Sequence, residues 1–218
     1  MSFDIARTPT LHAVATGDEQ QLVEDLQERV EAAICQAEET PAVVEAAEAQ
    51  RRAEQRFLSL QKAERALNQF AKSAGEKLAV MREAALDAVI QSAAEGDKLD
   101  FKGISELASL ESRSRQATRA IERLVERLLP LALWTRLREE SHAAITLGRA
   151  LEGVAQERAQ RVLDQLREAV GEEMILPVDL SKGVAGALLA RAADLKRRGV
   201  RLSSDADSIE KSLGGDRT

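Results

Sequence analysis

The chain has few of the residues that build thick globular cores or reactive sites. Its 218 residues include no tyrosine, one tryptophan, four phenylalanines, two histidines and one cysteine. A single cysteine excludes an intramolecular disulfide and any metal site made of several cysteines. His12 and His142 lie far apart, and neither has a second ligand one helical turn away. We therefore expect no enzyme activity, no metal and no cofactor.

Long apolar runs and an overall basic charge are missing as well. No stretch of about 18 apolar residues occurs, and the N-terminus has no basic segment followed by an apolar one. These absences predict a cytoplasmic protein without a membrane span. The net charge of −6 and the pI near 5.2 are unlike the basic surface of general nucleic-acid-binding proteins.

Residues 42–95 contain no proline and only one glycine, Gly75, and they are rich in Ala, Glu, Gln, Arg and Leu. These are strong helix formers. One unbroken helix here would be roughly 80 Å long at 1.5 Å of rise per residue, and the alternative is a break at Gly75 that makes a compact bundle. Apolar residues recur in alternating steps of three and four, with Glu64 as the one polar interruption, which is a heptad pattern: Phe57, Leu60, Leu67, Ala71, Ala74, Leu78, Met81, Ala85 and Ala88.

The remaining pattern predicts an all-α protein, an elongated antiparallel helical hairpin or coiled-coil-like bundle. A short N-terminal helix precedes the hairpin, and one or two small C-terminal helices follow it. We expect a mobile arm over residues 1–16, the hairpin over 17–173, and a small helical segment with a polar tail over 174–218. The tip is predicted at 96–103 because glycines flank it, and a kink is predicted near Pro130, since proline disrupts helix interiors.

Proline and glycine also predict where the shorter helices end. The first helix is expected to end near Glu39, because Pro41 cannot continue it. A C-terminal helix over 182–198 is expected to end at Gly199, a residue type common just after helices, and a last helix to begin near Ser203.

Folding the hairpin about its tip places residues whose numbers sum to roughly 199 side by side. In this register the bulkiest apolar residues of both arms share one layer. We expect that layer to be the buried centre of the hairpin: Leu67, Phe70, Leu128 and Leu131.

Two stretches are candidates for interaction sites. The run over 124–134, LVERLLPLALW, is the most apolar of the chain and too short to cross a bilayer. Core packing accounts for it, whereas surplus exposure of Leu129, Leu133 or Trp134 would mark an oligomer contact. The second is Phe101, which is expected at the hairpin tip and could be the working end.

A basic cluster closes the predicted C-terminal helix: Lys196, Arg197, Arg198 and Arg201. Positive charge is favourable at a helix C-terminus, so capping explains it. Docking to an acidic surface, such as the acidic first helix of the same protein, is a second interpretation. Binding to nucleic-acid phosphate is a third.

Together these features predict a non-enzymatic structural, scaffold or adaptor protein that acts through helix–helix contacts and forms a homo-oligomer. The alternative is weak association with nucleic acid through the basic C-terminal cluster. No residue pattern identifies a particular protein partner.

Overall fold

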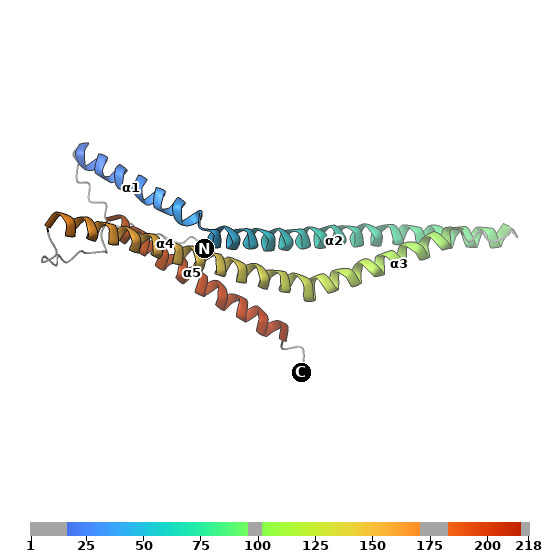
Figure 1. The fold of residues 1–218 in the computed structure, drawn as a ribbon. Coiled ribbons are helices and arrows are strands. Elements are labelled where there is room, and N and C mark those ends of the chain that lie inside the picture. The colour runs from blue at the N-terminus through green and yellow to red at the C-terminus, as the bar shows by residue number, and fades with distance from the viewer. Residues whose placement is uncertain (1–16, 96–101, 171–182, 215–218) are drawn as a thin grey trace, which may run out of the picture. The chain divides into compact units, whose positions relative to one another are not determined.

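The computed structural model describes residues 17–95, 102–170 and 183–214, and within them it is all-α, as predicted. The expected arm over 1–16 and most of the expected tip lie outside these residues. In chain order the elements are α1 (Gly17–Glu38), α2 (Pro41–Glu95), α3 (Lys102–Arg123), the π-helix η1 (Leu124–Leu128), α4 (Leu129–Val170) and α5 (Gly183–Gly214) (Figure 1).

The chain divides into two units, each made of segments that are distant in the sequence. Unit 1 comprises Met1–Val44 with Thr146–Lys196, and unit 2 comprises Glu45–Ile145 with Arg197–Thr218. Each unit therefore has to be held together by contacts between helices rather than by chain proximity.

Unit 1 has a compact apolar core made by α1, α4 and α5. Leu151 and Leu188 are fully buried there, and small residues surround them: Ala33, Ala37, Val154, Ala155 and Ala192. Gly148 lets α4 and α5 approach closely, because a Cβ at this position would lie 3.1 Å from the carbonyl oxygen of Ala192. Small residues on all three helices thus permit close packing around two leucines.

The turn between α1 and α2 forms where proline requires it. The amide N–H of Glu39 donates to the carbonyl of Cys35 at 3.0 Å, which completes α1, and the amide of Val44 donates to the carbonyl of Thr40 at 3.0 Å, which begins α2. Pro41 occupies the first position of α2, where its missing N–H costs no helical hydrogen bond. The predicted end of the first helix is confirmed.

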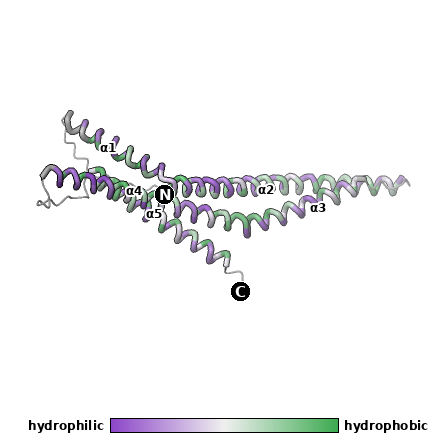
Figure 2. The backbone as a smooth tube through the Cα atoms, viewed as in Figure 1, coloured by the Kyte–Doolittle hydropathy of each residue, from purple (hydrophilic) through white to green (hydrophobic). Residues whose placement is uncertain are grey.

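α2 continues without a break through Gly75, which resolves the alternative that the sequence left open. A glycine inside a helix costs about 1 kcal/mol relative to alanine, too little to end a long helix whose neighbours are strong helix formers. Figure 2 shows apolar and polar residues alternating along α2 and α3, with no long apolar stretch in either.

The predicted heptad stripe of α2 is the face that unit 2 covers. Ala74 and Leu78 are buried, and Phe57, Leu60, Leu67, Ala71, Met81 and Ala85 are half-buried. Two details differ from the prediction, since Ala88 is exposed and Val89 takes its place. Leu58, Phe70 and Ile90, beside the stripe, are exposed.

α2 pairs with α3 and with the start of α4 in antiparallel fashion. Arg82 of α2 forms an ion pair with Glu111 of α3 at 2.5 Å, and Glu54 lies 4.0 Å from Arg136 of α4. The predicted register places Arg82 opposite Ala117, so the observed partner lies nearer the tip. The hairpin prediction is therefore correct in direction and offset in register.

The kink expected near Pro130 takes the form of the π-helix η1. The amide N–H of Leu129 donates to the carbonyl of Leu124, five residues back, and Figure 1 shows the ribbon changing direction where α3 passes into α4. A π-turn holds one more residue than an α-turn. The extra residue lies directly before Pro130, whose ring disrupts regular helical hydrogen bonding.

This extra residue overturns the predicted central layer of the hairpin. Leu128 and Leu131 would continue the stripe of an ideal helix from Leu124, but η1 rotates the following turns, and the buried position becomes Ala132. Leu128 and Leu131 are exposed, as is Phe70 on α2, and Leu67 is only half-buried. The buried residues of this part are instead Ala117, Leu124 and Ala132.

The prediction of two helices separated at Gly199 is wrong, because α5 is continuous through this residue. Gly199 is buried against α4, where a Cβ would lie 2.6 Å from Cγ1 of Ile145 and 3.0 Å from the carbonyl oxygen of Ser141. The buried Ser141 hydroxyl donates to the Gly199 carbonyl at 2.8 Å. Gly199 thus serves close helix packing rather than helix termination.

Candidate functional site

The apolar run over 124–134 contains both buried and exposed side chains, but the exposed ones are not Leu129, Leu133 and Trp134, whose exposure would have marked an oligomer contact. Leu129, Leu133 and Trp134 are half-buried. The guanidinium of Arg138 lies 5.5 Å from the centroid of the Trp134 ring, a cation–π distance. The indole Nε1 of Trp134 is buried and has no hydrogen-bond partner among the described residues.

The uncovered side chains of the run are Val125, Leu128 and Leu131, which we call the outer patch. They are 47%, 43% and 48% exposed, respectively. Val125 and Leu128 lie in η1, and Leu131 lies in the first turn of α4; the exposure of Leu128 and Leu131 results from the rotation that the π-turn imposes. Surplus apolar exposure was the predicted sign of an interaction site, and two of the three residues, Leu128 and Leu131, are ones that the helical pattern had assigned to the core.

A cavity of about 330 Å³ adjoins the outer patch at Leu131. It is lined by Leu131 and Trp134 of α4 and by Glu210, Leu213 and Gly214 of α5. Arg138 lies close by and forms ion pairs with Asp207 at 2.7 Å and Glu210 at 3.4 Å. These ion pairs hold the last part of α5 against α4 within unit 2.

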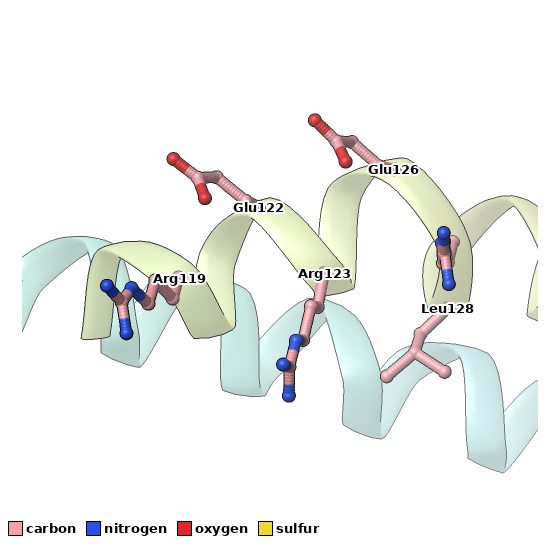
Figure 3. Close-up of a pocket in the computed structure, with 6 residues that line it drawn as sticks. Arg119, Glu122, Arg123, Glu126 and Leu128 are labelled. Atoms are coloured by element: carbon pink, nitrogen blue, oxygen red, sulfur yellow. The ribbon is translucent and has the colours of Figure 1, made fainter. Parts of the chain in front are cut away.

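A groove on the other side of Leu128 combines positive charge with apolar surface. We call it the arginine groove; its volume is about 430 Å³, and it is lined by Gln116, Arg119, Ala120, Arg123, Leu124 and Leu128. Figure 3 shows an adjoining pocket, which Arg123 and Leu128 also line and which Glu122 and Glu126 line as well. In this view Arg123 and Leu128 point to one side of the helix, and the two glutamates point to the opposite side. The lining of the arginine groove itself contains two guanidinium groups and no carboxylate.

The residues of the predicted basic cluster fall in both units. Lys196, in unit 1, forms an ion pair with Glu152 at 2.5 Å, and Arg198, in unit 2, forms one with Glu140 at 2.6 Å. Arg197 and Arg201 are exposed. The carboxylate partners of Lys196 and Arg198 both belong to α4.

The structure neither places nor tests Phe101, which lies outside the described residues. Further from the tip, the two arms of the hairpin are joined by a polar contact. Arg82 donates hydrogen bonds to Glu111, and this bonding lowers the pKa of the Glu111 carboxyl below its ordinary value, with a further contribution from the charges of Arg82 and Arg115.

Metal-ligating clusters are absent from the part of the chain that the structure describes. No group of three or more His, Cys, Asp or Glu side chains there could hold a metal ion, and His142 is exposed on α4. None of the described helices combines the length and apolar character that a membrane crossing requires. Comparison of the chain with family models, curated proteins and solved structures found no match.

Proposed function

We propose that the protein is a non-enzymatic structural, scaffold or adaptor protein that binds another protein through helix–helix contacts. The outer patch carries this proposal. Val125, Leu128 and Leu131 are spaced three residues apart, the spacing that an amphipathic partner helix contacts along one face. Fully burying a side chain of this type contributes about 1.5–3 kcal/mol, so three together can anchor a partner.

The π-turn of η1 supports an interaction role for the outer patch. A π-turn is rare and is often found at functional sites. Here it moves two large apolar side chains, Leu128 and Leu131, out of the seam and leaves Leu124 as the buried residue. Water-exposed apolar residues that gather on one face are typical of protein interaction sites.

The seams of unit 2 also favour association. Both large side chains that are fully buried among the described residues, Leu151 and Leu188, belong to unit 1. In unit 2 the buried apolar residues are mostly alanines, with Leu78 and Leu124 the leucines among them. Alanine buries little area, so a further helix packed on unit 2 would add stabilisation that its own seams lack.

Site-specific photo-crosslinking in the native cell tests this function. A photoreactive amino acid in place of Leu131 should form a covalent adduct with a protein partner, which is either a second copy of this chain or a different protein. Leu86 is the matched control, because it is also an exposed leucine, at 64%, but lies on α2 outside the outer patch. Equal labelling at both positions, or none at Leu131, would contradict the proposal. A cytoplasmic location remains the expectation for this experiment.

A further inference from the structure

A row of arginines runs along α3 and into η1, beside the outer patch. Arg115, Arg119, Arg123 and Arg127 follow one another at intervals of four residues, which places them on one side of the helix. Arg115 lies 3.7 Å from Glu111. In the described part of the chain the other three have no ion pair or hydrogen bond, although many arginines of unit 2 have a carboxylate partner: Arg82, Arg136, Arg138 and Arg198.

The arginine groove places two of these cations beside apolar surface. Arg119 and Arg123 line it together with Leu124 and the exposed Leu128. A ligand that fills this groove has to offer both carboxylates and apolar groups. Phosphate alone would match the arginines and leave the apolar part of the groove uncovered.

The first half of α1 has the complementary character. The apolar stripe of α1 is buried at Ala33 and Ala37 and half-buried at Val30, all in the second half of the helix. In the first half, Leu26 and Val23 are 40% and 52% exposed. Acidic side chains flank the exposed part, and all of them are exposed: Glu24, Asp25, Glu28 and Glu31. Unit 1 therefore covers the second half of the α1 stripe and leaves Val23 and Leu26 of the first half without a covering partner among the described residues.

We propose that the arginine groove of one copy binds the first half of α1 of a second copy. This inference rests on the proposed function and names its partner. Val23 would cover the exposed Leu128, and the carboxylates of Glu24 and Glu28, four residues apart, would pair with Arg119 and Arg123, which have the same spacing. Such pairing sets the orientation and the specificity of helix contacts.

The contact joins two different surfaces of the chain, so it is heterologous. Each copy offers one groove and one α1, so association either closes in a reciprocal dimer or continues head to tail into rings or filaments. The distribution of charge along the chain agrees with this polarity, since residues 1–40 contain nine acids and two bases. Because the pairing is partly ionic, it should weaken as salt is added.

Charge reversal in the full-length chain tests the proposal by sedimentation velocity at increasing protein concentration. The wild type should associate, and Arg119→Glu with Arg123→Glu should weaken association by on the order of a hundredfold. Glu24→Arg with Glu28→Arg should do the same. A mixture of the two variants should associate again, because the unchanged α1 of the first meets the unchanged groove of the second. Arg51→Glu with Arg65→Glu, on exposed positions of α2, controls for net charge.

Far-UV circular dichroism confirms that each variant retains its helix content before association is compared. A wild type that stays monomeric overturns the proposal, as does a mixture that fails to associate, or an effect of the α2 control equal to that of the groove variant. Loss of DNA or RNA binding in the groove variant, with no self-association in the wild type, would overturn it in favour of nucleic acid. If Leu131 crosslinks to a different protein while the wild type is monomeric, the proposed function stands and the second-copy partner is wrong.

Discussion

Replacing Gly199 by alanine tests the close approach of α4 and α5 in unit 2. The new Cβ would lie 2.6 Å from Cγ1 of Ile145 and 3.0 Å from the carbonyl oxygen of Ser141. The first neighbour belongs to a β-branched side chain that is stiff at χ1, and the second is backbone. Neither can move aside without shifting a helix.

The expected magnitude follows from two opposing contributions. Inserting a methyl group into a packed site costs about 1–3 kcal/mol, and removing a glycine from a helix interior recovers up to about 1 kcal/mol. Because backbone is one of the two contacts, we expect a net loss of about 1–2 kcal/mol in the free energy of unfolding. For a chain of this size that lowers the melting temperature by roughly 2–8 °C.

Thermal and urea unfolding, followed by circular dichroism, measure the effect against two matched controls. No atom lies within 4 Å of a Cβ built at Gly75 or Gly153, so Gly75→Ala and Gly153→Ala should each stabilise by about 0.5–1 kcal/mol. Truncating the neighbour in Ile145→Ala should reduce the cost of Gly199→Ala, since contacting sites are coupled. A Gly199→Ala variant as stable as Gly75→Ala would refute the packing described here.

Three further predictions concern unit 2. Leu124→Ala should lower the free energy of unfolding by about 2–4 kcal/mol, because Leu124 is 7% exposed, whereas Leu131→Ala should cost less than about 1 kcal/mol; equal losses in urea unfolding would contradict the rotated seam. Glu111 has a lowered pKa in the folded state, so its stabilising contribution is present above the ordinary carboxyl pKa and is lost as the pH falls through the lowered value; Glu111→Gln should flatten the acid side of a stability-versus-pH curve, and an unchanged curve would show that the ion pair adds nothing. Deleting Glu126 removes the extra residue of η1 and forces Pro130 into a regular α-helix at a cost of about 3 kcal/mol; the same deletion with Pro130→Ala should melt near the wild type, and equal melting points for both deletions would disprove the link between proline and π-turn.

Local rules predicted the helices well where a single residue decides. Pro41 ends α1 because it cannot donate a backbone hydrogen bond, and the strong helix formers around Gly75 outweigh one glycine. The α2 stripe was predictable because its steps of three and four continue from Phe57 to Ala85 with Glu64 as the one polar interruption.

The sequence-based predictions are wrong where contacts between residues distant in the sequence determine the structure. Gly199 resembles a helix-ending glycine in the sequence, and only the position of Ile145 on α4 shows why the residue has to be small. The run over 124–134 does carry exposed apolar side chains, but they are Val125, Leu128 and Leu131 rather than Leu129, Leu133 and Trp134. Pro130 indicated an irregularity, and nothing in the sequence says that it is a π-turn with its extra residue before the proline.

Hydrogen–deuterium exchange at low and high protein concentration tests the central claim most directly. Amides open by local unfolding, and a helix that gains a partner opens less often. The account predicts that exchange slows at high concentration in two segments, the first half of α1 and residues 115–131, and is unchanged in the middle of α2. Identical exchange at both concentrations, or protection confined to segments outside these two, would contradict it.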